Sequence, residues 1–298
     1  MAYNDPQAAQ QLPFPEESVA AILSALGEDF TISGESGIGD VTFVEGNSFT
    51  DPDGMSPVIL FDDNGDGASF TAGADETLDR FISGTSGDDA FVTAGGSDEV
   101  RLGSGNDVVD TGGGTDVAIL NGAYAPDRVQ VQEDGSVVVD NGDGTQATLR
   151  NTEILQFDDT KVVVTNNAKD GVVALLYEAA FDRQLDNAGY KFWTQGPADD
   201  LTVDQIAEYF TESEEFQNLF ADVSNAEFVS QIYANFFDRE VDEAGYNFWL
   251  NLLETEEIDR GTFLSNVAAS DEATAKFEAI VKIVGSTPTD TTDDSGAV

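Results

Sequence analysis

A nine-residue period runs through the centre of the chain, from Gly84 to Ile119. Each nonapeptide carries a glycine, an aspartate two residues later, and a mostly apolar residue two residues after that. Glycine permits a tight turn, aspartate supplies a hard anionic oxygen, and the apolar residue forms a short strand that fills an interior. The period therefore predicts a coil that binds calcium at its turns. The predicted metal-binding residues are Asp89, Asp98, Asp107, Asp116, Gly87, Gly96, Gly105 and Gly114.

Two nonapeptides make one turn of such a coil, so loops stack at a spacing of two repeats. On this geometry Asp89 faces Asp107 along one edge, and Asp98 faces Asp116 along the other. A flexible loop rich in glycine and aspartate is the alternative, but loops do not keep a strict period with an apolar residue in phase. We therefore expect a coil of about two turns from the four nonapeptides.

The repeats resemble those of the repeats-in-toxin, or hemolysin-type, family of secreted proteins, whose G-G-x-G-x-D-x-U-x motif folds as a parallel β-roll around calcium. The resemblance covers the residues from Gly84 to Ile119. It implies Ca²⁺ as the cofactor. It also implies export through a type I system that reads an uncleaved C-terminal signal, and the polar, acidic tail at 286–298 fits such a signal. We therefore expect an extracellular or cell-surface location.

The composition points to cations as partners. Twelve basic and 58 acidic residues give a net charge of −46, which repels nucleic acid and anionic membranes. With neither cysteine nor histidine, the chain has no disulfides, no Cys/His zinc site and no Ser-His-Asp triad. The N-terminus lacks the basic and apolar regions of a cleaved signal peptide, and no stretch is long enough to span a membrane.

We place the boundary between the N-terminal region and the coil at residue 70. Residues 1–70 are expected to hold a short helix from Ser18 to Leu26 and β-like runs at 41–44 and 58–61, and residues 71–122 the β-roll. Asp62, Asn64 and Asp66 have the spacing that opens a calcium loop, but the twelfth position is a glycine instead of an acid. They are either an ordinary acidic turn or a weak auxiliary calcium site.

Residues 123–167 alternate apolar and polar positions between Asn-Gly and Asp-Gly turns. This pattern predicts antiparallel strands at 128–132, 137–139, 147–149, 151–157 and 161–164. A coil of two turns leaves open ends, so we expect these strands to cap it.

Residues 168–285 change to helical periodicity and contain a second duplication, because the segment Leu176–Trp193 recurs as Ile232–Trp249. Each copy predicts a helix, a turn at Asp182 or Asp238, and a second helix capped by Asp186 or Asp242. A capping box at Thr202 and Gln205, and an aspartate at 259, begin further helices. The expected fold is therefore multidomain α+β: a short parallel calcium β-roll flanked by antiparallel β segments, and a C-terminal all-α bundle of two related halves.

The duplicated segment resembles a helical domain of unknown function, the 4214 domain-of-unknown-function family, found in bacterial secreted proteins beside calcium repeats. The resemblance implies no chemistry. Tyr190, Phe192 and Trp193, with their counterparts at 246, 248 and 249, form either the helical core or a sugar-stacking face, which keeps carbohydrate among the candidate ligands. Arg183 and Arg239 are expected to pair with the aspartates three residues on, with an acidic ligand as the alternative.

We therefore expect a secreted, non-catalytic calcium-binding structural protein in cell-surface, matrix or adhesion assembly. The coil would condense with calcium after export, and the helical domain would contact a protein partner or another copy of itself. One alternative is a self-assembling extracellular scaffold, such as a filament or surface layer. The other is a carboxylate-dependent, glycan-active hydrolase that uses the coil as an export module.

Overall fold

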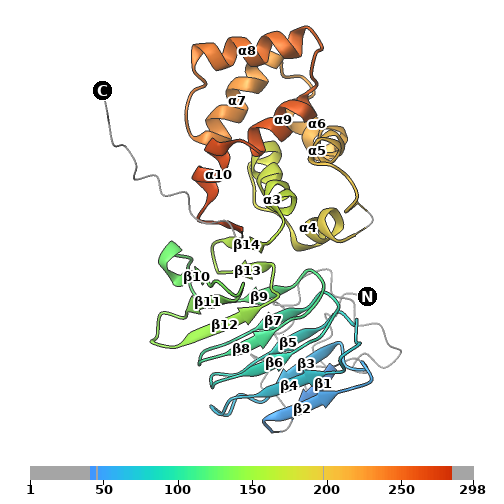
Figure 1. Cartoon of the computed structure of the whole chain (residues 1–298), viewed down its shortest axis with the longest axis vertical. Coiled ribbons are helices and arrows are strands. Elements are labelled where there is room, and N and C mark those ends of the chain that lie inside the picture. Colours follow the sequence, from blue (N-terminus) through green and yellow to red (C-terminus); the bar gives the residue numbers. More distant parts are fainter. Residues whose placement is uncertain (1–40, 45, 197, 284–298) are drawn as a thin grey trace, which may run out of the picture.

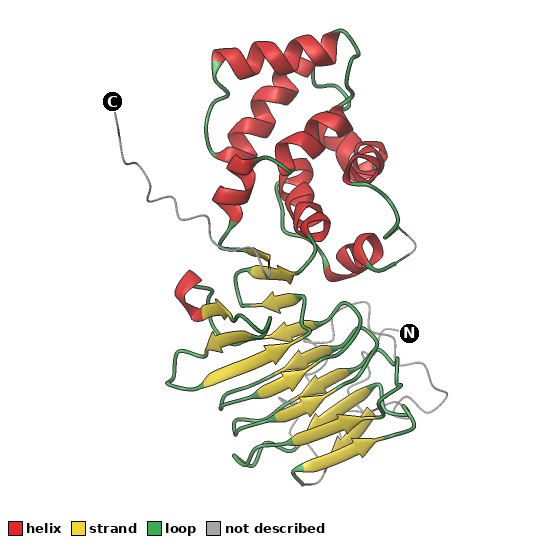
Figure 2. Cartoon of the chain, in the orientation of Figure 1, coloured by secondary structure: helices red, strands yellow, loops and turns green. Residues whose placement is uncertain are grey.

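The computed structural model describes residues 41–44, 46–196 and 198–283 (Figure 1). Strands stack on one another toward one end of the molecule, and helices gather at the other end (Figure 2). The helix predicted from Ser18 to Leu26 and the predicted tail at 286–298 lie outside the described residues.

The strands form a β-solenoid of about four turns with two sheets, and the strands within each sheet of the coil run parallel to one another. Successive strands alternate between the sheets, so each pair of strands makes one turn of the coil. The first sheet contains β1 (Val41–Val44), β3 (Val58–Phe61), β5 (Phe81–Ser83), β7 (Glu99–Arg101) and β9 (Val117–Ile119). The second contains β2 (Ser48–Asp51), β4 (Ser69–Ala72), β6 (Ala90–Val92) and β8 (Val108–Asp110).

The nonapeptides supply the strands β6 to β9, which are the two turns that the period predicts. The coil also extends further toward the N-terminus than residue 71, because β1 to β4 join the same two sheets in parallel register. The β-like runs at 41–44 and 58–61 are therefore coil strands.

The apolar residue of each nonapeptide fills the inside of the coil. Phe91 and Val109 are paired across neighbouring turns of the second sheet, and Val100 and Ala118 across those of the first. All four are 1% exposed or less. Burying a valine or phenylalanine side chain contributes roughly 1.5–3 kcal/mol, so this column supplies much of the coil's stability.

The strands after the nonapeptides are antiparallel neighbours, as predicted, but they also continue the coil. They follow a short 3-10 helix η1 (Pro126–Arg128). β10 (Val129–Val131) pairs antiparallel with β11 (Val137–Asp140), and β11 pairs antiparallel with β12 (Gln146–Arg150). β13 (Ile154–Gln156) pairs antiparallel with β14 (Lys161–Thr165). However, β12 lies parallel to β8, and β13 lies parallel to β9. The predicted cap is thus built into both sheets of the solenoid.

The remaining chain forms two related groups of helices. The first group is α3 (Ala168–Phe181), α4 (Asn187–Thr194), α5 (Val203–Glu212) and α6 (Glu214–Phe220). The second group is α7 (Asn225–Phe237), α8 (Glu243–Glu254), α9 (Arg260–Ala268) and α10 (Asp271–Phe277). The chain then returns to the first sheet as β15 (Val281–Ile283), parallel to β14. The helical region predicted over 168–285 therefore ends in a strand.

The local helix signals act as predicted. Asp182 and Asp238 end α3 and α7 in the left-handed region, with φ of 51° and 53°. The Asp186 carboxylate accepts a hydrogen bond from the Gly189 amide at 2.7 Å and so caps α4. Asp242 caps α8 in the same way, and the Thr202 capping box begins α5.

Each half is held by an arginine whose main partner differs from the prediction. Arg183 forms two hydrogen bonds with Glu215, at 2.7 and 2.9 Å, whereas the expected partner Asp186 is 3.6 Å from its guanidinium. Arg239 makes the equivalent pair with Glu272, at 2.7 Å for both bonds. The glutamates lie on α6 and α10, so each ion pair connects the turn after the first helix of a half to the last helix of that half.

The end of the solenoid packs against the helical domain in one hydrophobic cluster, which is distinct from the core inside the coil. Val117, Ile154 and Val163 from the sheet belong to the same buried cluster as Val173 and Leu176 of α3. The helices thus cover the C-terminal end of the coil (Figure 1).

Candidate functional site

The four aspartates of the period are buried and form two rows along the coil. The Asp89 amide donates to Asp107 Oδ1 at 3.0 Å, and the Asp98 amide donates to Asp116 Oδ1 at 2.7 Å. Each carboxylate therefore holds the backbone of the preceding turn. These are the two edge pairs that the period predicts, and we call the two rows the aspartate ladder.

The ladder extends beyond the nonapeptides. In one row, the Ala68 amide donates to Asp89 Oδ1 at 2.7 Å. In the other, the Arg80 amide donates to Asp98 Oδ1 at 2.8 Å, and the Asp116 amide donates to Glu153 Oε2 at 2.9 Å. Glu153 thus occupies the ladder position of the next turn. Sequence analysis missed it because it lies outside the nine-residue period.

Glycines let the turns of the ladder approach one another closely. Gly105 has a φ of 113°, and a Cβ there would lie 2.3 Å from the Gly87 carbonyl oxygen. Gly114 has a φ of 137°, and a Cβ there would lie 1.7 Å from the Gly96 carbonyl oxygen. These predicted glycines therefore place backbone carbonyls of one turn against the backbone of the next, beside the aspartates.

Three ladder aspartates carry a buried oxygen without a partner. The Oδ2 atoms of Asp98, Asp107 and Asp116 have no hydrogen-bond partner among the described residues. In contrast, Asp89 uses both oxygens, accepting from the amides of Ala68 and Thr85. Burial raises the pKa of Asp98 and of Asp107 to about 7, and that of Asp116 to about 8. Near neutral pH, these carboxyl groups require either a proton or a cation.

The donor types suit calcium, which binds carboxylate and carbonyl oxygens in irregular shells. Within 41–283, leaving out residues 45 and 197, no three acidic side chains come together as a metal-binding group. Calcium on the ladder would therefore take one or two carboxylates and complete its shell with backbone carbonyls of the glycine turns. Glu153 adds a further carboxyl group to the row of Asp98 and Asp116, and its negative charge adds to the burial that raises the pKa of Asp116.

Asp62, Asn64 and Asp66 lie in an exposed turn between β3 and β4. The Asp66 amide donates to Asn64 Oδ1 at 2.9 Å, and the Asn64 side chain contacts Asn47 at 3.4 Å. The acid that binds the next turn is Asp63, whose Oδ1 accepts from the Ser86 amide at 3.0 Å. The arrangement is that of an Asx turn, which is the simpler of the two predicted interpretations.

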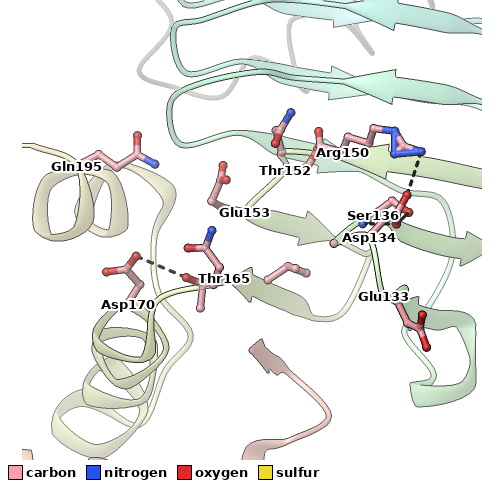
Figure 3. Close-up of a pocket in the computed structure, with 13 residues that line it drawn as sticks. Glu133, Asp134, Ser136, Arg150, Thr152, Glu153, Thr165, Asp170 and Gln195 are labelled. Atoms are coloured by element: carbon pink, nitrogen blue, oxygen red, sulfur yellow. Dashed lines mark hydrogen bonds and ion pairs between the residues drawn. The ribbon is translucent and has the colours of Figure 1, made fainter. Parts of the chain in front are cut away.

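A pocket of about 460 Å³ lies between the end of the coil and the helical domain (Figure 3). Its lining is almost entirely polar and joins segments that are far apart in the sequence. The side chains that matter most are Glu153, Thr165, Asp170 and Gln195, with Asp134 and Arg150 at another side. No sequence pattern pointed to this pocket.

The aromatic residues of the helical repeat are divided between core and surface. Tyr190 is 1% exposed, and Trp193 packs against the core while its Nε1 donates to the Tyr177 hydroxyl at 3.2 Å. Phe192 and Phe248 are exposed at equivalent places in the two copies. The six aromatic residues therefore do not form one stacking face.

Comparison with protein-family models gives a match to the Domain of unknown function (DUF4214) at residues 160–220 and again at 207–277. The two matches cover the two helical halves, in agreement with the duplication. No curated protein matches the chain. In the part of the chain that the structure describes, no helix is long and apolar enough to cross a membrane.

Proposed function

We propose that this protein is a calcium-dependent structural component of the cell exterior, in which calcium stabilises the solenoid and the helical domain contacts a protein partner. The observation that carries the proposal is the set of three buried carboxylate oxygens without partners, on Asp98, Asp107 and Asp116. A structural role in cell-surface, matrix or adhesion assembly fits a coil whose main chemical feature is a column of carboxylates.

Energetics favour a cation over a proton on these groups. A carboxyl group with an unfolded pKa of 3.8 that stays protonated at pH 7 costs the folded state about 4 kcal/mol, at about 1.4 kcal/mol per pH unit. A bound calcium ion works against that cost, because at one hundred times its dissociation constant it stabilises the folded state by about 2.7 kcal/mol per site. Extracellular calcium modules work at roughly 10⁻⁴ to 10⁻³ M. The net charge of −46 adds repulsion that cations relieve.

Export follows from the same chemistry under this proposal. Where calcium is scarce, the acidic turns repel one another and the coil is weakly stable, which suits passage through a type I exporter. Where calcium is plentiful, the ladder closes. The resemblance of the nonapeptides to repeats-in-toxin proteins supports this sequence of events.

The duplication in the helical domain supports the proposal that this domain contacts a protein partner. Phe192 and Phe248 are 44% and 56% exposed at equivalent places in the two copies, next to the tryptophans at 193 and 249. Two similar apolar points on one rigid unit favour a bivalent partner or a second copy of the chain.

Thermal unfolding of the full chain in calcium, magnesium or chelator tests the proposal. We expect millimolar calcium to raise the melting temperature of the β signal in circular dichroism. Magnesium should do much less, because it demands a tight octahedral shell and gives up water reluctantly. An equal response to both ions, or to neither, contradicts a calcium function for the ladder.

A self-assembling scaffold is the second candidate, and one observation favours it. Within the described residues, β2 pairs with another strand on one side only, so it forms an outer edge of its sheet. Unpaired strand edges are templates for another chain. Light scattering with and without calcium separates the candidates, since a scaffold grows on calcium addition and a monomeric adhesion component does not.

A further inference from the structure

The pocket at the junction places a carboxylate of the coil opposite one of the helical domain. Glu153 precedes β13, and Asp170 lies in the first turn of α3. Figure 3 shows Glu153, Asp170 and Gln195 around the same pocket, with Thr165 beside Asp170. The Thr165 hydroxyl lies 3.5 Å from Asp170 Oδ2.

Buried polar atoms without partners lie in and around the pocket lining, since Asp170 lines the pocket whereas Asp116 and Tyr190 lie outside the lining. Asp170 Oδ1, the Tyr190 hydroxyl and Asp116 Oδ2 have no hydrogen-bond partner among the described residues. Tyr190 is 1% exposed and Asp116 is fully buried. Burial raises the pKa of Tyr190 well above its usual value, and the charges of Asp170 and Glu153 raise it further, against a weak opposing interaction with Thr165. The negative charges of both carboxylates therefore act on this hydroxyl.

Basic side chains beside the pocket are engaged with other acids. Arg150 Nη2 lies 3.4 Å from Asp134 Oδ2, and Lys169 Nζ lies 2.9 Å from Asp199 Oδ1. Glu153 accepts a hydrogen bond from the Asp116 amide at 2.9 Å, which holds its carboxylate in place without neutralising it. The two basic side chains are thus paired with acids other than Glu153 and Asp170.

We propose that this pocket binds one calcium ion that bridges Glu153 of the coil and Asp170 of the helical domain, separately from any ion on the aspartate ladder. Two carboxylates balance the charge of a divalent cation. Neutral oxygens such as the Thr165 hydroxyl, together with water in the 460 Å³ space, complete a shell of six to eight oxygens. A site with two acids also agrees with the absence of any three-acid group within the described parts of the chain.

Such an ion would connect the two halves of the molecule. Glu153 continues the ladder row of Asp98 and Asp116, while Asp170 belongs to the helix that packs in the shared hydrophobic cluster. Binding at the junction would therefore couple the helical domain to the folding of the coil.

Calcium and terbium binding to the full chain test the site. Terbium substitutes for calcium, and its emission is sensitised by a nearby phenol, here Tyr190. We expect Glu153→Gln and Asp170→Asn each to remove one calcium ion per chain in calorimetric titration and to weaken terbium binding at least about tenfold. Asp134→Asn is the matched control, because Asp134 lines the same pocket but already pairs with Arg150. It should leave both readouts unchanged.

Two further variants separate this site from the ladder and from misfolding. Tyr190→Phe should lower terbium emission and keep the calcium count. Asp107→Asn should lower the calcium count and keep the emission, so failure of the ladder proposal and failure of this one are distinguishable. Glu153→Gln retains an acceptor for the Asp116 amide, and circular dichroism confirms its fold. An unchanged calcium count in both Glu153→Gln and Asp170→Asn, or an equal loss in Asp134→Asn, overturns the junction site.

Discussion

Replacing Asp116 with asparagine should stabilise the calcium-free protein, and added calcium should remove or reverse that advantage over the parent. The amide keeps an oxygen for the Asp98 amide, which donates to Asp116 Oδ1 at 2.7 Å, and it removes the buried charge. Without calcium, burial raises the pKa of Asp116 from 3.8 to about 8, so at pH 7 the folded state holds a proton that the unfolded chain lacks. That difference is worth about 4 kcal/mol, as an upper bound, at about 1.4 kcal/mol per pH unit.

The new amide group reduces the gain. Asp116 Oδ2 has no hydrogen-bond partner among the described residues, so an –NH₂ group in its place is a buried donor that costs about 1–3 kcal/mol. Asp116→Asn should therefore stabilise the calcium-free protein by about 1–3 kcal/mol. At a calcium concentration one hundred times the dissociation constant the parent gains about 2.7 kcal/mol from the site, whereas the variant does not, so the variant's advantage disappears or reverses.

Urea unfolding at pH 7, followed by circular dichroism in chelator and in millimolar calcium, measures both free energies. Asp88→Asn is the control, because exposed Asp88 also accepts a hydrogen bond from the next turn, from the Asn106 amide at 2.7 Å, without a buried charge. It should change little in either buffer. If Asp116→Asn destabilises the protein equally in both buffers, the hydrogen bond and not the charge determines the role of this residue, and our reasoning is wrong.

Three further outcomes follow from the structure. Burial raises the folded-state pKa of Asp98 and of Asp107 from 3.8 to about 7, so their stabilising contribution is complete below about pH 4 and is lost as the pH rises through 7. The urea midpoint of unfolding in chelator should therefore fall between pH 5 and 8. Calcium should flatten this pH dependence. Gly114→Ala should lower the unfolding free energy by at least about 2 kcal/mol, whereas Gly113→Ala, where a Cβ meets nothing within 4 Å, should cost about 1 kcal/mol or less in the same assay. A double-mutant cycle on Arg239 and Glu272 should give a coupling of about 1 kcal/mol or less, since both side chains are more than a third exposed; a much larger coupling would show that this pair organises the helical half.

The sequence predicts the coil where its period is unbroken and misses it where two ladder positions carry other residues. Ala68 and Arg80 stand one turn before Asp89 and Asp98, and only their backbone amides take part in the ladder. Arg80 turns its guanidinium to a buried ion pair with Asp51, at 3.6 Å, so this turn already contains a positive charge. This turn keeps the geometry of the coil although its sequence does not follow the nine-residue pattern.

Predictions in the helical domain succeed or fail according to distance along the chain. Caps such as Asp186 and Asp242 act within three residues and are readable from local rules. The partners of Arg183 and Arg239 depend on how distant helices pack, and only the fact that Glu215 and Glu272 recur in both copies offered a signal. The junction pocket joins four separate segments of the chain, so no spacing could reveal it.

The hydrophobic cluster shared by the coil and the helices gives the solenoid one anchored end. Val117 of β9 and Ile154 of β13 are buried together with α3, whereas β1 and β2 stand at the far end of the described stack of strands. In a stack where each turn contacts only adjacent turns, opening starts at the boundary with the fewest contacts. Fraying should therefore begin at β1 and β2 and advance toward β9. Hydrogen exchange should then show protection rising steadily from Val41 to Ile154, and loss of calcium should steepen that gradient instead of lowering it evenly.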